Sequence, residues 1–136
     1  MSTLAHTVSR EVVLDAPPEQ VWEALTDEAA LSEWLASEVE LDPREGGEII
    51  CRFEDGEERR GEVELVEEAE RLAFHWWREG RGPSRVEFTV DAVAGGTLLT
   101  VTESGIALPT APAMLVAGWN GRLGALRLTL GRLILA

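Results

Sequence analysis

Cysteine and basic residues are scarce in this 136-residue sequence, and both shortages restrict what the protein can be. A single cysteine, Cys51, excludes an internal disulfide and any zinc site built on several thiols. The sequence has 12 basic and 25 acidic residues, so its formal net charge is −13. The average surface field therefore repels nucleic-acid phosphates and anionic lipids. We therefore expect a reducing, cytoplasmic setting and no nucleic-acid partner.

Long apolar runs and compact catalytic motifs are also missing. The first twenty residues contain Glu11, Asp15 and Pro17 in place of an apolar signal core, and no run approaches the roughly 20 apolar residues of a membrane span. The sequence has no GxSxG, HExxH, phosphate-binding or dinucleotide-binding motif. We expect a protein that is neither secreted nor integral to a membrane and that carries no cofactor.

The length fits one domain over residues 1–136 with a single core. Alternating apolar residues and turn signals predict strands at residues 7–14, 38–41, 48–54, 60–66, 71–78, 84–93 and 97–104. Two short helices are expected after the first strand, the second capped by Thr26-Asp27, and a long helix is expected over residues 113–135. The predicted order is therefore β-α-α, six further strands, and a final α-helix.

The strand pattern gives the predicted sheet one apolar and one polar face, as is typical of antiparallel sheets. Only the long final helix can cover the apolar face, so we predict an α+β fold in which a curved antiparallel sheet wraps around that helix. Four glycines at positions 118, 121, 124 and 131 lower its helix propensity and would let it lie close to the sheet. Its leucines are expected to face the sheet, and its arginines, Arg122, Arg127 and Arg132, to face solvent or acidic loops.

Several segments also resemble a known family. They are VSREVVLDAPPEQVWEALTDEAALSEWL at 8–35, Gly46-Gly47-Glu48, RLAFHW at 71–76, GTLLTV at 96–101 with Glu103-Ser104-Gly105, and Gly118-Trp119. In this order they resemble homologues of the activator of heat shock protein 90 ATPase. That family lies within the START/SRPBCC helix-grip superfamily of lipid-transfer, pollen-allergen and polyketide-cyclase domains. The resemblance implies a helix-grip fold with a cavity for apolar or aromatic ligands between the sheet and the final helix.

Inward-facing strand residues and the inner side of the last helix would line such a cavity. The predicted ligand-binding residues are Trp34, Phe53, Phe74, Trp76, Phe88, Val101, Glu103, Met114 and Trp119. Five tryptophans are many for this length, and they either fill the core or stack on a ligand.

Glu103 is the one candidate catalytic residue, and it stands where the family often carries a histidine. Alternation directs its side chain inward, where burial would raise the pKa of a carboxyl group. Alternatively, it lies near solvent at the end of its strand or pairs with an arginine. His75 should point away from the cavity, and neither it nor His6 has a metal-ligand spacing to Cys51, so we expect no metal site. Cys51 is expected to be an inert inward residue because no histidine is near it in the sequence to lower its pKa.

These observations favour a module that binds a small hydrophobic or aromatic molecule and is not an enzyme. Two alternatives stay open: a co-chaperone role toward heat shock protein 90, which rests on the family resemblance, and a cyclase-like enzyme that uses Glu103. The sequence is compatible with a monomer or a homodimer. If two subunits meet, the basic helix of one against the acidic sheet face of the other is the expected contact.

Overall fold

The structure is a computed structural model that describes residues 5–78, 82–107 and 112–135, with side chains described for residues 7–78, 82–105 and 115–131. The predicted order of elements is confirmed. The elements are β1 (Ala5–Leu14), α1 (Pro18–Thr26), α2 (Glu28–Trp34), β2 (Glu38–Leu41), β3 (Glu48–Arg52), β4 (Glu58–Glu67), β5 (Arg71–Trp77), β6 (Ser84–Val93), β7 (Gly96–Ala107) and α3 (Pro112–Leu135). The side chains of Met114 and Arg132 lie outside the described residues, so the predictions made for them do too.

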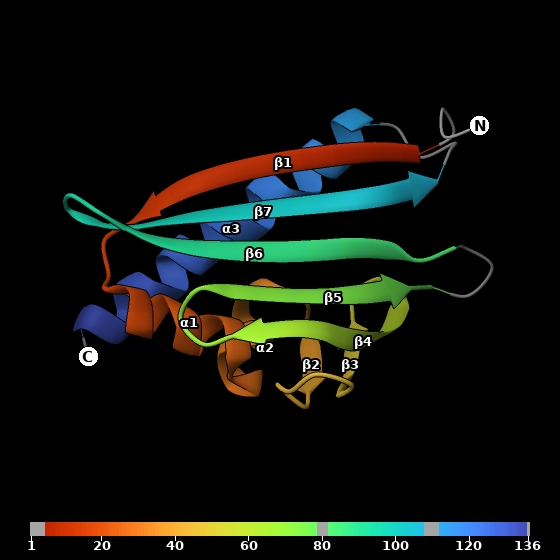
Figure 1. Cartoon of the computed structure of the whole chain (residues 1–136), viewed down its shortest axis with the longest axis horizontal. Helices are drawn as coiled ribbons and strands as arrows, with labels where there is room; N and C mark the ends of the chain where they lie inside the picture. Colours follow the sequence, from red (N-terminus) through yellow and green to blue (C-terminus); the bar gives the residue numbers. More distant parts are fainter. Residues whose placement is uncertain (1–4, 79–81, 108–111, 136) are drawn as a thin grey trace.

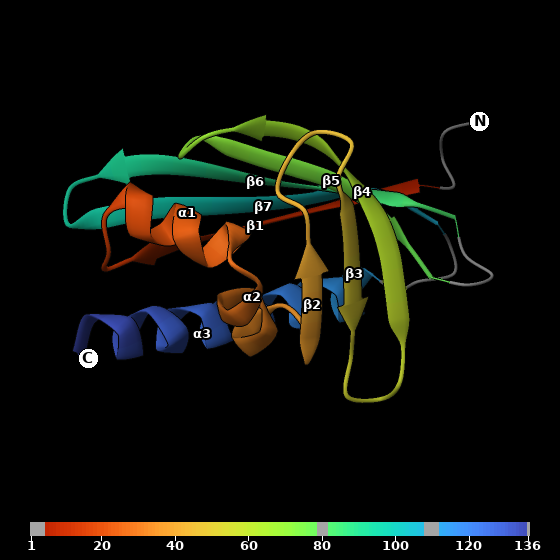
Figure 2. The same cartoon turned by 90° about the horizontal axis from the view of Figure 1, so that it is seen from below.

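The seven strands form one antiparallel sheet in the order β1-β7-β6-β5-β4-β3-β2 (Figure 1). The sheet bends strongly, so that β2 and β3 run across the direction of β6 and β7 (Figure 2). Where β4 pairs with β5, the strands approach so closely that a Cβ atom on Gly61 would overlap the carbonyl oxygen of His75. A glycine at this position therefore permits the close approach of the two strands.

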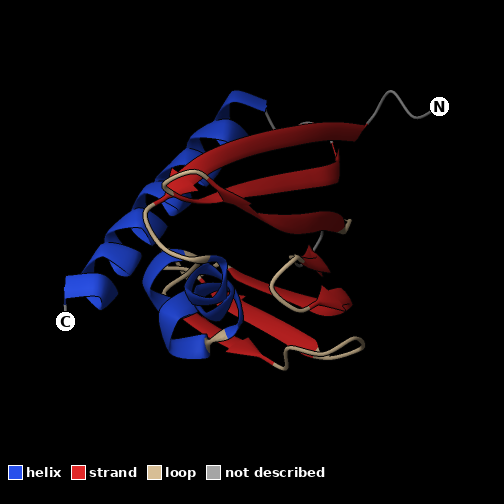
Figure 3. Cartoon of the chain, turned by 60° about the vertical axis from the view of Figure 1, so that its left-hand side comes forward, coloured by secondary structure: helices blue, strands red, loops and turns tan. Residues whose placement is uncertain are grey.

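All three helices lie on the concave side of the sheet (Figures 2 and 3). Pro18 begins α1, since its fixed φ suits the first helical position. Asp27 caps α2 as predicted, because its carboxylate accepts a hydrogen bond of 2.9 Å from the backbone N–H of Ala30. Together α1 and α2 close one end of the curved sheet and lead the chain into β2 at its edge (Figure 1).

The final helix, α3, is continuous through its glycines and crosses the sheet diagonally (Figure 1). Leu123, Leu126 and Leu130 are buried beneath it, as predicted. The expected role of the glycines is wrong, because a Cβ atom at Gly121 or Gly124 would meet no atom within 4 Å. These glycines face solvent, and burial of the opposite, leucine-bearing face holds the helix despite their low propensity. None of the described helices is long and apolar enough to cross a membrane.

Candidate functional site

Glu103 lies at the centre of a buried hydrogen-bond cluster beneath α3. Strand β7 directs its side chain inward as predicted, and only 3% of the residue is exposed. Its Oε2 accepts hydrogen bonds from the indole N–H of Trp76 at 3.0 Å and from the hydroxyl of Ser84 at 2.5 Å. Its Oε1 accepts one from the indole N–H of Trp119 at 2.9 Å. One carboxylate thus satisfies two buried indole groups that would otherwise lack an acceptor.

Aromatic rings fill the space around this carboxylate. The indole rings of Trp76 and Trp119 stack with centroids 6.2 Å apart at 24°, and Phe88 contacts Trp119 edge-on at 5.9 Å. Phe74 joins the cluster at 5.4 Å from Trp76, and Trp34 at 5.8 Å from Phe88. These five residues and Val101 were predicted to line a cavity, and the structure places them together as a packed, buried group.

Arg122 on α3 extends the cluster toward the surface, which corrects the expectation that it faces solvent or an acidic loop. Its guanidinium lies 4.7 Å from the ring centroid of Trp119, 5.5 Å from Phe53 and 5.8 Å from Trp76. The side chain is half-buried because position 122 is one helical turn beyond Trp119 and so borders the buried face of α3. Arg127 is exposed as predicted, and its guanidinium donates a hydrogen bond to the carbonyl oxygen of Val13.

A second guanidinium, that of Arg59 on β4, approaches the same rings. It lies 4.6 Å from the centroid of Trp76 and 5.0 Å from that of Phe53, and pairs with Glu57 at 2.6 Å. Burial, together with the charge of Arg59, lowers the pKa of Arg122, and the charge of Glu103 partly offsets this effect. The two arginines therefore form a site of positive charge on an aromatic surface, although the chain as a whole is acidic.

Cys51 also belongs to this region, since it pairs with Arg59 in the β3–β4 register. Two arginines that are distant from it in sequence, Arg59 and Arg122, are near enough to favour the thiolate. Burial outweighs them and raises the pKa of Cys51 to about 12. The prediction of an inert thiol stands in this setting, because a thiol with such a pKa stays protonated at neutral pH.

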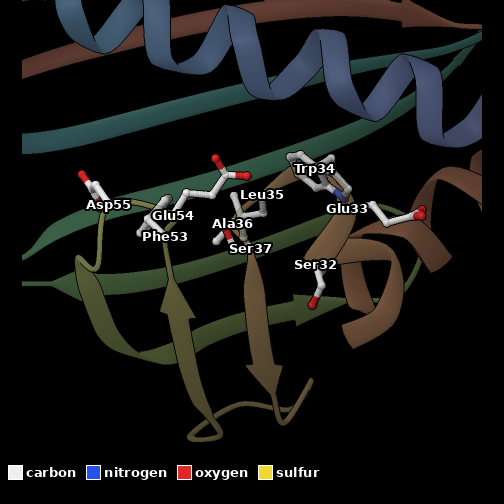
Figure 4. Close-up of a pocket in the computed structure, with 9 residues that line it drawn as sticks. All are labelled: Ser32, Glu33, Trp34, Leu35, Ala36, Ser37, Phe53, Glu54 and Asp55. Atoms are coloured by element: carbon white, nitrogen blue, oxygen red, sulfur yellow. The ribbon is translucent and has the colours of Figure 1, made fainter.

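A groove of about 450 Å³ opens beside the cluster, between the end of α2 and the β3–β4 hairpin (Figure 4). It is lined by Ser32, Glu33, Trp34, Leu35, Ala36, Ser37, Phe53, Glu54 and Asp55. Phe53 lines the groove and also contacts Trp76 at 6.4 Å, so its ring joins the groove to the buried cluster. Of the nine predicted ligand-binding residues, Trp34 and Phe53 thus border the open space.

Sequence reasoning missed Arg59, Arg122 and most of the groove. Arg59 adjoins the cluster only because β4 pairs with β3 and the sheet bends, and no local pattern in the sequence indicates that bend. The position of Arg122 was readable in principle, as it is three residues after Trp119 on one helix. His75 points to the outer face as predicted, where its Nδ1 lies 3.1 Å from Glu64. In the described part of the chain, no three potential metal ligands come together.

The family model described as activator of Hsp90 ATPase homolog 1-like protein matches residues 15–131. The chain belongs to this family. No curated protein sequence matches it. As expected from the resemblance, this Hsp90-activator-like chain has the helix-grip fold, with the sheet wrapped around α3.

Solved structures agree with the family assignment. Protein MLL2253 from Mesorhizobium loti is 28% identical, with a TM-score of 0.87 over 93% of this chain and 98% of that one. DynU16, from the dynemicin biosynthetic locus, is 31% identical with a TM-score of 0.82, and the match covers 92% of this chain and 47% of DynU16. The AHSA1-like protein from Aeromonas hydrophila, at 23% identity and a TM-score of 0.80 over 96% of each chain, shares the fold.

Proposed function

We propose that this protein binds a small hydrophobic or aromatic molecule, with the groove between α2 and the β3–β4 hairpin as its site. The observation that carries the proposal is the groove itself. Its volume of about 450 Å³ falls within the range of small-molecule sites, roughly 300–1,000 Å³. Ala36 and Phe53 supply partly exposed apolar surface, and Trp34 and Leu35 border the groove as buried residues. The serines and carboxylates at its edge remain accessible to solvent.

Binding suits the geometry better than catalysis by Glu103. Both oxygens of this carboxylate already accept hydrogen bonds from Trp76, Ser84 and Trp119, and the residue is buried behind the two indole rings. A general acid or base needs access to a proton on the substrate, at hydrogen-bond distance. Glu103 instead orients the rings that form the inner wall of the aromatic region.

A neutral aromatic probe, 2-naphthol, tests the proposal. We expect its addition to ¹⁵N-labelled protein to shift the indole N–H resonance of Trp34 saturably, because Trp34 lines the groove. Ala36→Phe should lower the affinity at least about 10-fold, since a phenyl ring there would occupy the apolar part of the groove. Ala29→Phe, on an exposed position of α2, is the matched control and should leave the affinity unchanged.

Two results would contradict the proposal: no saturable shift in the wild-type protein, or the same affinity in Ala36→Phe as in the wild type. The circular dichroism spectrum of each variant shows that the fold is retained. Native mass spectrometry of the purified protein would identify any ligand that it carries from the cell.

A further inference from the structure

Arg122 has five N–H donors and no acceptor for them among the described residues. It forms no ion pair and no hydrogen bond within the described part of the chain, where its guanidinium lies over three aromatic rings. A half-buried guanidinium whose donors are unpaired is costly, because part of its hydration is lost without replacement. Ring faces offset some of this cost but accept no directed hydrogen bond. The arrangement leaves room for an acceptor that the described part of the chain does not supply.

Arg59 increases the demand for a negative charge at this position. The two guanidinium groups lie within 5.8 Å of the centroid of the same ring, that of Trp76, and repel each other. Glu57 does not neutralise both of them, since it pairs with Arg59 at 2.6 Å and with Arg78 at 3.0 Å. Glu103 acts on Arg122 only through space, because its oxygens are bonded to other donors.

Phe53 links these arginines to the groove. Its ring centroid is 5.0 Å from the guanidinium of Arg59 and 5.5 Å from that of Arg122, and the same side chain lines the groove. Neither arginine lines the groove, but both guanidinium groups lie over the ring of Phe53, so a molecule that contacts Phe53 from the groove would have them across this ring. The side chain of Arg122 runs back along α3, since one of its terminal nitrogens would lie 3.7 Å from a Cβ atom placed on Gly118.

We propose that the ligand of the groove is a planar aromatic carboxylate, whose carboxylate group is bound by Arg122 with support from Arg59. This inference rests on the proposed function and narrows its ligand class. The planar guanidinium matches a carboxylate with two parallel N–H···O bonds, which a neutral ligand cannot provide. The ring of the ligand lies in the groove and contacts Phe53 there.

The carboxylates at the rim of the groove repel an anionic ligand only weakly. Glu33, Glu54 and Asp55 are exposed to solvent, so water and salt screen their charges over a Debye length of about 8 Å at physiological ionic strength. Contact with a half-buried guanidinium is screened much less. The rim slows the approach of an anion more than it weakens the bound state.

A pair of isosteric probes, 2-naphthoate and 2-naphthamide, tests the charge requirement in the complete protein at 0.15 M salt. We expect wild-type protein to bind 2-naphthoate about 10-fold more tightly than 2-naphthamide, as measured by calorimetry or by the indole N–H resonances. Arg122→Met should bind both with similar, amide-like affinity. Arg127→Met removes an exposed arginine from the same helix and should retain the full preference.

The outcomes separate the two proposals. Equal affinity of the wild-type protein for both probes overturns the carboxylate assignment while the binding function stands. A preference that survives in Arg122→Met overturns it as well, because the charge would then be recognised elsewhere. If neither probe binds, the groove is not an aromatic site and both proposals fail. The wild-type comparison does not depend on whether Arg122→Met folds.

Discussion

Glu103 connects two elements that are distant in sequence through one side chain. Its carboxylate accepts a hydrogen bond from Trp76 on β5 and another from Trp119 on α3. Indole N–H groups can only donate, so a group with two acceptor oxygens fits between them and an amide does not. The residue that the sequence marked as a candidate catalyst is, in the structure, the acceptor that fixes the aromatic cluster.

Glu103→Gln tests this role. We expect a loss of about 1–3 kcal/mol in the free energy of unfolding, because the amide nitrogen would face an indole N–H and leave a buried donor unpaired. Urea denaturation followed by fluorescence measures the loss. Ser84→Ala removes one donor but leaves both indole bonds, so it should cost less than Glu103→Gln. A glutamine variant as stable as the wild type would refute the structural role.

For single residues, the sequence predicted the direction of the side chains well and their contact partners poorly. Strand alternation placed Glu103 and Trp76 inward and His75 outward, since side chains in a strand alternate regardless of tertiary context. The prediction for Arg122 was wrong because a position bordering the buried face of a helix can turn its long side chain either way. Its choice depends on Phe53 and Trp76, which come from other strands.

At the scale of elements, two glycines differ in whether the fold leaves room for a side chain. Gly61 lies where β4 passes close to β5, and a methyl group there would overlap the carbonyl oxygen of His75 and press on Ile49. Gly124 lies on the outer face of α3, where a methyl group would meet nothing within 4 Å. Glycine is thus required by a close backbone contact in β4 and only tolerated in α3.

The paired variants Gly61→Ala and Gly124→Ala should therefore change stability in opposite directions. We expect Gly124→Ala to raise the free energy of unfolding by roughly 0.5–1 kcal/mol, because alanine has less freedom to lose on forming the helix. Gly61→Ala should lower it by about 2 kcal/mol or more, as overpacked sites do. Thermal denaturation of the two variants beside the wild type measures both effects. A stabilised Gly61→Ala would mean that the close approach of β4 to β5 relaxes readily.

Element bounds were predictable where turn residues enclose a clear alternation. The predicted strands at residues 38–41 and 84–93 coincide with β2 and β6, because Asp42-Pro43 ends the first and Gly95-Gly96 follows the second. The bend of the sheet was expected only in outline, and the close approach of β4 to β5 at Gly61 was not predicted. The groove was not predicted because its walls, the end of α2 and the β3–β4 hairpin, meet only in the folded chain.

At the scale of the whole molecule, composition makes the alkaline titration unusually simple. The sequence contains no tyrosine, and all 12 of its basic residues are arginine, so Cys51 is the one side chain that ordinarily titrates between pH 9 and 12. Burial raises the pKa of Cys51 from 9.0 to about 12 in the folded protein. Between these values the unfolded chain has lost a proton that the folded chain retains, so stability falls as the pH rises.

We expect the free energy of unfolding to fall by about 1.4 kcal/mol between pH 8 and pH 10. Most of this loss comes between pH 9 and pH 10, because the thiol of the unfolded chain is largely protonated below its pKa of 9.0. Urea denaturation at a series of pH values measures this slope. Cys51→Ala should be less stable at pH 8 because of the lost volume, but its stability should not change over the same interval. A slope shared by both proteins would assign the effect to another group.

The stacked indoles of Trp76 and Trp119 also give the molecule an internal optical reporter. Their ring centroids are 6.2 Å apart with an interplanar angle of 24°, and each ring belongs to a different layer of the fold, β5 in the sheet and α3 against it. Their contribution to near-ultraviolet circular dichroism depends on this fixed packing, so it is lost when the helix leaves the sheet. Far-ultraviolet ellipticity, in contrast, reports the helix whether docked or not. The two spectral regions together distinguish separation of α3 from its unwinding, without any added label.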